Sequence, residues 1–387
     1  MKKSLLALAL TGAFALTAHA QSSVTLYGVI DTGLVFTNNQ GGHNNWQETS
    51  ASTENTVYGL KGSEDLGGGL HAIFKLENGF NLNSGSLFNA GDAFGEQAYV
   101  GVQSDQFGTV LLGRQFDTVN DVLGPISSAG GTYGGNLSAH PFNNDNLAAD
   151  SMSINNAVKF TSNTYAGVTV EGMYGFSNKA GEFSNNRVYG FGATYAHGPF
   201  NLAAGYLELN NAGGGVSGTN QNGAVALDDG SADFVAQRQR IWGTGGNYTF
   251  GSATVGLLWT HSQIDNMSSV FAGGDGFVAL GGGLRLDNYE VNAHYALTPS
   301  LSIAGAYTFT DGSFSNGGTS ASPEWNQFTL QTDYSLSKRT DVYLEGVYQH
   351  VHGAPAGSVL SDASINTLSP SSSGTQVAVT VGLRHQF

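Results

Sequence analysis

The sequence predicts an all-β fold, a 16-stranded antiparallel transmembrane β-barrel, and three observations support this prediction. Segments of about ten residues alternate apolar and polar side chains with a period of two, as a strand between lipid and water requires. Short and long connections between these segments alternate along the chain. All seven prolines fall in the connections, as expected because proline donates no hydrogen bond to a sheet.

The last segment shows the alternation most clearly. One of its faces is apolar and the other is polar or small, since Val379, Val381 and Leu383 alternate with Ala378, Thr380 and Gly382. A strand with lipid on one side and water on the other has this pattern. The same pattern predicts strands over residues 23–37, 54–64, 70–82, 95–104, 109–116, 152–163, 167–177, 187–197, 200–210, 236–250, 252–264, 284–297, 301–311, 325–336, 341–351 and 375–387.

The connections predict which strand ends lie together. The short ones span residues 64–69, 105–108, 163–167, 197–200, 250–252, 297–300 and 335–341. The others have roughly ten to 35 residues and are rich in Gly, Asn and Ser. Short turns at one end and long loops at the other are typical of a membrane barrel. Residues 117–150 form the longest of these loops.

The first twenty residues have the features of a secretory signal peptide. Lys2 and Lys3 precede an apolar run over residues 5–16, and small residues flank His19 at the expected cleavage site. The run is too short for a membrane-spanning helix. We therefore expect a signal peptide over residues 1–20 and a barrel domain over residues 21–387.

Charge and composition narrow the classes of function. Charged residues make up 11% of the chain, against roughly 25% in soluble domains. The net charge is −15, and it becomes −17 when Lys2 and Lys3 are removed, so no nucleic-acid partner is expected. The chain has no cysteine and no recognisable phosphate-binding or metal-binding motif. We expect no cofactor and no bound metal.

Four stretches resemble the general diffusion porins of Gram-negative bacteria, in the form found in β-proteobacteria. They are QSSVTLYGVIDTGL at residues 21–34, YGLKGSEDLGGGL at 58–70, LGRQ at 112–115 and GLRHQF at 382–387. The resemblance implies a homotrimer in the cell outer membrane, among bilayer lipids and lipopolysaccharide, through which small hydrophilic solutes and ions diffuse passively. It also implies that residues 117–150 fold into the lumen as the third long loop. The barrel-assembly machinery would recognise Phe387.

Alternation and the resemblance together predict a pore constriction. Lys61 and Lys75 share a strand face with polar or small residues, and Arg114 lies where a strand enters the loop. We expect these side chains to face the lumen, because a charge at the bilayer midplane on the lipid side costs about 2–4 kcal/mol. The resemblance places acidic loop residues opposite this basic group, here Asp117 and Asp121. Asp145 and Asp150 fit better as turn-capping or solvated residues.

The sequence departs from the family at two basic positions. Val57 and Ser153 stand where many relatives carry an arginine. Since two basic constriction residues are missing, we predict a weakly selective or mildly cation-preferring pore.

Three other functions or folds fit the sequence less well. A soluble β-sandwich also alternates, but it does not explain a signal peptide together with sixteen strands and few charges. An outer-membrane enzyme lacks support, since the chain has no G-x-S-x-G motif. A substrate-specific outer-membrane channel remains the alternative, although only Tyr27 and Tyr99 provide inward aromatic rings by strand alternation.

Overall fold

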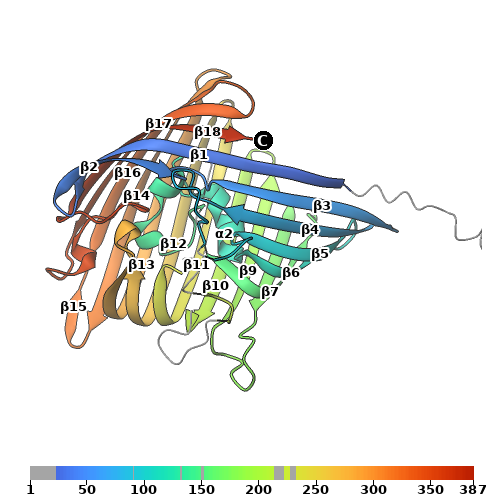
Figure 1. Ribbon diagram of the computed structural model, residues 1–387, viewed down its shortest axis with the longest axis horizontal. Helices are drawn as coiled ribbons and strands as arrows, with labels where there is room; N and C mark the ends of the chain where they lie inside the picture. The colour runs from blue at the N-terminus through green and yellow to red at the C-terminus, as the bar shows by residue number, and fades with distance from the viewer. Residues whose placement is uncertain (1–22, 90, 131–132, 150–151, 213–221, 227–231) are drawn as a thin grey trace, which may run out of the picture.

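The structure is a computed structural model, and it describes residues 23–89, 91–130, 133–149, 152–212, 222–226 and 232–387 (Figure 1). The predicted signal peptide over residues 1–20 lies outside the described residues, and so does Asp150.

One antiparallel sheet of eighteen strands forms the molecule (Figure 1). Two of its strands, β2 (His43–Ser50) and β15 (Thr319–Ala321), pair only with the ends of β1 and β14 and belong to loops. The other sixteen form the wall, which confirms the predicted number. The wall strands are β1 (Ser23–Gln40), β3 (Val57–Gly67), β4 (Leu70–Gly79), β5 (Gln97–Ser104), β6 (Gly108–Phe116), β7 (Ser153–Ser162), β8 (Val168–Gly175), β9 (Arg187–His197), β10 (Phe200–Asn210), β11 (Phe234–Phe250), β12 (Ala253–Phe271), β13 (Phe277–Ala296), β14 (Leu301–Asn316), β16 (Glu324–Ser335), β17 (Thr340–His352) and β18 (Thr375–Gln386).

The wall closes where the first and last strands meet. β1 pairs with β3 along its first half and with β18 along its second half. Gly28 and Phe387 exchange backbone hydrogen bonds of 3.1 and 3.0 Å at this seam. Closure leaves the wall without a free edge, so every wall strand has two neighbours and its backbone polar groups are paired.

The outer face of the wall is apolar. In β18, Val379, Val381 and Leu383 are 40%, 59% and 44% exposed. The alternating residues Ala378 and Thr380 are each at most 1% exposed. This alternation confirms the pattern from which the strand was predicted. The apolar face is turned outward and the polar face is covered from within.

Strands β11–β14 run further than predicted. β12 continues to Phe271 and β13 begins at Phe277, so their connection spans residues 272–276, whereas the predicted strands left residues 265–283 between them. In these extensions the apolar side chains, such as Val270 and Phe314, are buried on the inner face. The strands were predicted from apolar side chains on the outer face. The predicted strands therefore ended where the apolar side chains change to the inner face.

The short helix α2 (Thr118–Leu123) and the other described residues of 117–130 and 133–149 pack against the inner face. α2 rests on β9, β10 and β11, where glycines leave room for it. A Cβ atom on Gly192 would lie 2.6 Å from Val122 Cγ1, and one on Gly243 would lie 3.0 Å from Leu123 Cδ1. Among the described residues, no helix has the length and apolar character needed to cross a membrane. The sequence analysis did not predict α2.

Candidate functional site

We use the name inner segment for residues 117–130 and 133–149, which lie between β6 and β7 in the chain. Besides α2, the inner segment contains the short helices η1 (Gly124–Ile126), η2 (Gly135–Ser138) and η3 (Pro141–Asn143). Gly134 donates a backbone hydrogen bond of 2.5 Å to Gln331 Oε1, and Ser138 Oγ donates one of 2.7 Å to Thr329 Oγ1. Gln331 and Thr329 lie on the buried face of β16. The inner segment therefore contacts the wall through the side chains that do not face outward.

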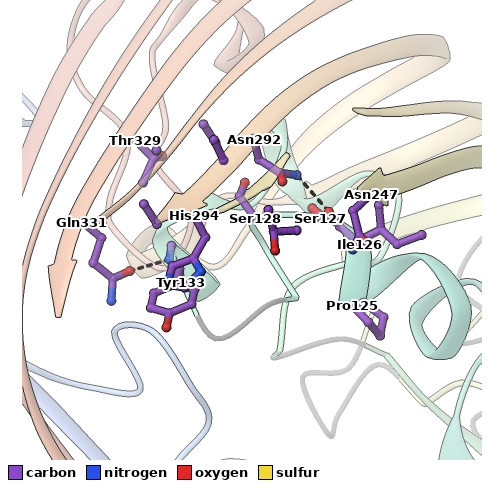
Figure 2. Close-up of a pocket in the computed structure, with 16 residues that line it drawn as sticks. Pro125, Ile126, Ser127, Ser128, Tyr133, Asn247, Asn292, His294, Thr329 and Gln331 are labelled. Atoms are coloured by element: carbon purple, nitrogen blue, oxygen red, sulfur yellow. Dashed lines mark hydrogen bonds between the residues drawn. The ribbon is translucent and has the colours of Figure 1, made fainter. Parts of the chain in front are cut away.

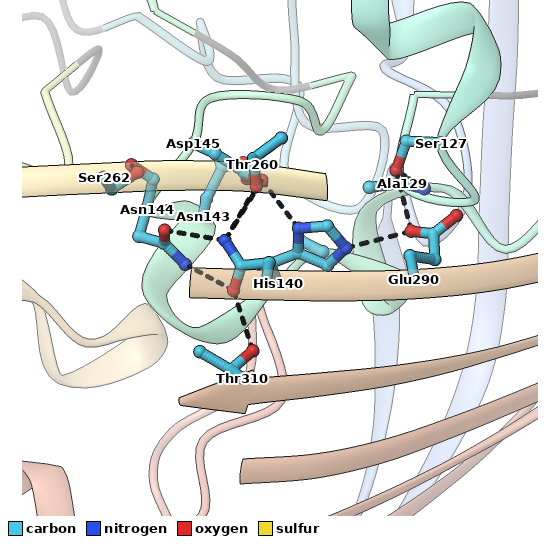
Figure 3. A network of polar contacts seen from close by, with 12 residues as sticks. Ser127, Ala129, His140, Asn143, Asn144, Asp145, Thr260, Ser262, Glu290 and Thr310 are labelled. Carbon is cyan, nitrogen blue, oxygen red and sulfur yellow. Dashed lines mark hydrogen bonds and ion pairs between the residues drawn. The ribbon is translucent and has the colours of Figure 1, made fainter. Parts of the chain in front are cut away.

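A buried histidine links the inner segment to β13. His140 Nδ1 lies 2.7 Å from Asp145 Oδ2, and His140 Nε2 lies 2.9 Å from Glu290 Oε2 (Figure 3). All three side chains are 0% exposed. Burial lowers the pKa of His140, but the carboxylates of Asp145 and Glu290 outweigh this effect and raise the pKa to about 10. The imidazole is therefore protonated at neutral pH and lies between two buried carboxylates.

Amide and hydroxyl groups extend this contact to the neighbouring strands. Asn288 Nδ2 donates a 3.0 Å hydrogen bond to Asn144 Oδ1, and Ser262 Oγ donates a 2.7 Å bond to the Asn144 carbonyl (Figure 3). Asp145 also accepts a hydrogen bond from Thr260. The expectation that Asp145 caps a turn or is solvated is therefore wrong, because its carboxylate is completely buried against β12 and β13.

A cavity of about 320 Å³ separates the other side of the inner segment from β3, β4 and β5. Lys75 and Glu77 of β4 line it from the wall, and Asn120 and Asp121 line it from the inner segment. Glu54, Glu96 and Val57 complete part of the lining. We call this space the charged cavity, because basic and acidic side chains line it together.

Lys61 lies beside Lys75 on the neighbouring strand, although Lys61 itself does not line the charged cavity. Lys75 Nζ is 3.0 Å from Glu77 Oε2, and the Tyr27 hydroxyl donates a 2.7 Å hydrogen bond to the same oxygen. Lys61 is directly opposite Lys75 in the sheet register, and its Nζ lies 4.9 Å from the centroid of the Tyr27 ring. This distance allows a cation–π contact. Tyr27 thus connects the two lysines to Glu77.

Three of the predicted site residues do not line the charged cavity, namely Lys61, Arg114 and Asp117, and the last two are buried. Arg114 is 7% exposed and donates 2.6 Å hydrogen bonds to the Gly95 carbonyl and to Asn155 Oδ1. Asp117 is 0% exposed and caps α2 by accepting hydrogen bonds from the backbone of Val119 and Asn120, at 2.7 and 3.0 Å. Arg114 was predicted from its place at a strand end and Asp117 from the family resemblance, and neither observation indicated the backbone that covers these side chains.

Burial also changes the acidity of Asp117. It raises the pKa of this carboxyl group to about 7, although the hydrogen bonds from Asn120 and Val119 act in the opposite direction. At neutral pH the carboxyl group is therefore only partly ionised, because burial disfavours its charged form in the folded chain.

Several residues that contact the site were not predicted from the sequence. Lys159 of β7 pairs with Asp121 and also donates a 3.0 Å hydrogen bond to the Phe116 carbonyl. Arg384 of β18 lies 3.6 Å from Glu54 Oε2. Inward alternation on their strands could have identified Lys159, Arg384 and Glu290. No sequence signal singled out His140, whose partners are 5 and 150 residues away.

Metal binding finds no support in the side-chain arrangement. Within the described ranges, no three His, Cys, Asp or Glu side chains are grouped so that they could hold a metal ion. His350 and His352 stack with ring centroids 5.9 Å apart, and His352 lies 3.3 Å from Glu324.

Comparison with known proteins identifies relatives along the whole chain. The family described as Gram-negative porin matches residues 5–354. An outer membrane porin protein of Bordetella pertussis is 29% identical over 425 residues, and outer membrane porin protein 32 of Delftia acidovorans is 26% identical over 398 residues. Both alignments cover 100% of each chain.

Solved structures share the fold. The anion-selective porin from Comamonas acidovorans superposes with a TM-score of 0.72 at 22% sequence identity, and the match covers 95% of this chain and 100% of that one. OmpT of Vibrio cholerae in its trimer form gives a TM-score of 0.64 at 18% identity, and the match covers 95% of this chain and 99% of that one.

Proposed function

Because the chain belongs to the Gram-negative porin family, we propose that the inner segment narrows its water-filled channel at the charged cavity. The protein is an outer-membrane porin, and small hydrophilic solutes and ions cross it by passive diffusion. The observation that carries the proposed constriction is that Lys75 and Asp121 line one cavity from opposite sides. Members of this family are channels rather than enzymes, and the proposal contains no catalytic step.

The proposed constriction consists of Lys61, Lys75 and Asp121, with Lys159 holding Asp121 in place. Arg114 and Asp117 act as positioning residues at the first end of the inner segment. A charged lining of this kind orients polar solutes and sets ionic preference. Recording the step conductance of the purified protein in a planar bilayer tests the proposal, because substitutions at Lys75 or Asp121 should change conductance or ionic preference.

The balance of charges supports a weak preference for cations. Among the described residues that line the charged cavity, one is basic, Lys75, and four are acidic. The acidic residues are Glu54, Glu77, Glu96 and Asp121. The pairs that Glu77 and Asp121 make with lysines reduce their net field but do not reverse it. A reversal potential that shows clear anion preference across a salt gradient would contradict this part of the proposal.

We also propose that the protein forms a homotrimer through the outer face of β3–β6. This face is mostly aliphatic, with Leu60, Val100 and Leu112 between 38% and 58% exposed. Elsewhere, near the short turns, exposed tyrosines such as Tyr195 and Tyr295 form an aromatic border of the kind found between lipid and water. Near its own short turns, the β3–β6 wall exposes Leu66 and Leu70 beside Phe107, and this mostly aliphatic surface suits a neighbouring subunit.

The subunit interface is tested with two matched substitutions. We expect Val100→Lys to dissociate the trimer in detergent, because it places a charge in the proposed interface. Val291→Lys, on the exposed face of β13, should leave the oligomer intact. Native mass spectrometry or unheated gel migration distinguishes the two, and equal behaviour of both variants would exclude this interface.

Four arginines on the outer face support lipopolysaccharide as a partner. Arg187, Arg238, Arg240 and Arg285 alternate with buried residues on β9, β11 and β13, so they point away from the lumen. Arg240 and Arg285 lie in one cross-strand row with Gln263 between them. The rows nearer the short turns carry Trp242, Trp259 and Tyr289, which mark the edge of the apolar zone. We propose that this arginine group binds the phosphates of the lipid headgroup.

Co-purified lipopolysaccharide per protein chain tests this partner. Arg240→Gln combined with Arg285→Gln should lower the bound amount, whereas Arg339→Gln, in the turn before β17, should not. An unchanged amount in the double variant would argue against the arginine group.

The proposal for the barrel-assembly machinery rests on Phe387. This residue is 40% exposed and follows the seam-forming strand β18. We expect Phe387→Ala to slow assembly in cells while the purified chain still folds in detergent. Equal assembly rates in cells would exclude this role.

A further inference from the structure

A second cavity lies between the inner segment and the wall formed by β11–β14 and β16 (Figure 2). Its volume is about 230 Å³. Asn247 and Thr254 of its lining flank the turn between β11 and β12, and His294 is close to the end of β13. The cavity is therefore on the side of the inner segment that faces the short turns. We call it the uncharged pocket.

The lining of the uncharged pocket differs from that of the charged cavity. Its side chains are amides, hydroxyls, small apolar groups and two stacked rings, and no Asp, Glu, Lys or Arg is among the described residues that line it. An ion that entered the pocket would lose its hydration without gaining a counter-charge, which is unfavourable. The pocket therefore suits a neutral polar molecule.

Two buried nitrogen atoms of the lining have no partner among the described residues. They are His294 Nε2 and Gln331 Nε2. Gln331 is 1% exposed, and its Oε1 already accepts the hydrogen bond from Gly134, so the amide nitrogen is the free end of the side chain (Figure 2). A buried donor without an acceptor is unfavourable, and a bound molecule with hydroxyl oxygens would satisfy it.

An aromatic surface adjoins these nitrogen atoms. Tyr133 stacks on His294 with ring centroids 4.1 Å apart and an angle of 17° between the rings (Figure 2). Tyr133 is only half-buried, so part of its ring remains open to the pocket. A ring with hydrogen-bonding groups at its border can pack against the C–H face of a sugar or polyol while the hydroxyl groups find partners.

We propose that the uncharged pocket binds a small neutral polyol, of about the size of a monosaccharide, on its way through the channel. This inference rests on the proposed diffusion path past the inner segment, and it adds a preferred class of solute. Tyr133 provides the packing surface, and His294 and Gln331 provide the hydrogen bonds. The pocket favours a channel that retains neutral hydroxylated solutes over one that is indifferent to them.

The experiment compares two neutral probes of similar size. D-glucose carries several hydroxyl donors and acceptors, whereas tetraethylene glycol is a flexible ether with hydroxyl groups only at its ends. Both are added at increasing concentration to single channels in a planar bilayer. In parallel, saturation-transfer NMR on the purified protein in detergent reports binding of each probe without requiring ion flow. We expect glucose to reduce the open-channel current saturably and to show saturation transfer, and tetraethylene glycol to do neither.

Two substitutions locate the binding site. His294→Phe keeps a ring against Tyr133 but removes the free nitrogen, so the apparent affinity for glucose should fall about fivefold, the usual range for one neutral hydrogen bond. Tyr133→Leu removes the packing surface and should weaken binding at least as much. His197→Phe, an exposed position near a short turn, is the matched control and should bind glucose as the original chain does.

The outcomes separate this inference from the proposed function. Normal ion conductance with no difference between glucose and tetraethylene glycol would overturn the polyol site and leave the channel intact. Equal glucose binding by His294→Phe, Tyr133→Leu and the original chain would overturn the assigned residues. Absence of conductance would contradict the channel, and the NMR comparison would still decide whether the pocket binds glucose.

Discussion

The imidazole of His140 lies 2.9 Å from the carboxylate of Glu290, although 150 residues separate them in the chain. This contact joins the inner segment to the opposite part of the wall from the strands that line the charged cavity. Because Asp145 holds the other ring nitrogen at 2.7 Å, the position of the ring is fixed from both sides. The width of the charged cavity therefore depends on a contact on the far side of the inner segment.

Removal of this imidazole should free the inner segment. His140→Ala leaves Asp145 and Glu290 as buried carboxylates without a cation, and breaking such a pair typically costs about 3–5 kcal/mol. We expect a noisier and larger open-channel current in planar bilayers, with the barrel itself still folded. His43→Ala, at an exposed position in β2, is the control. An unchanged current in His140→Ala would show that other contacts suffice to hold the inner segment.

The contacts of His140 with Asp145 and Glu290 should stabilise the inner segment less as pH rises. The pKa of His140 in the folded chain is about 10, above its ordinary value of 6.5, so the stabilisation is complete below pH 6.5 and is lost progressively as pH rises towards 10. Asp117 acts in the same direction, because its raised pKa of about 7 disfavours the folded state as pH rises from 3.8 to 7.

Hydrogen exchange measures this pH dependence. Protection of the inner segment, corrected for the chemical exchange rate, should be lower at about pH 9 than at about pH 6. His140→Gln should show a smaller change between the two conditions. Protection that increases with pH would mean that the sign assigned to His140 is wrong.

The glycines beneath α2 should be sensitive to added volume. A Cβ atom on Gly192 would lie 2.6 Å from Val122, so Gly192→Val should displace α2 at a cost of about 1–3 kcal/mol. Gly346 on β17 has no atom within 4 Å of such a Cβ, so Gly346→Val is the matched control. Step conductance should change in the first variant alone. Similar currents in both would indicate that α2 adapts without moving.

Asp121 should influence ionic preference. Asp121→Asn removes an acidic charge from the lining and leaves the buried Lys159 without its partner, so the reversal potential should shift towards anions. Asp275→Asn makes the same chemical change at an exposed position in the connection between β12 and β13 and should have little effect. Equal shifts would show that total charge, rather than the charged cavity, sets the preference.

Residue alternation predicted the wall well, because each wall strand places apolar side chains on the outer face and polar or small ones on the inner face. Val381 and Thr380 follow this rule, and so do Lys75 and Asp333 on their strands. Beyond the apolar zone the apolar side chains point inward instead, and Val270 and Phe314 therefore lay outside the predicted strands.

The candidate site was predicted only in part. Strand alternation placed Lys75 correctly on the inner face, and the family resemblance directed attention to Asp121. The contacts of His140, Asp145 and Glu290 depend on the path of the inner segment, which no local pattern encodes. The same reason explains why Asp117 and Arg114 were expected at a surface and are buried.

The most direct test of the proposed channel is the step conductance of the purified protein in a planar bilayer, recorded with the reversal potential across a salt gradient. We expect open steps at low voltage, closure in three equal stages and a weak preference for cations. A folded barrel that gives no steps would contradict the channel, and strong anion preference would contradict the proposed role of the charged cavity.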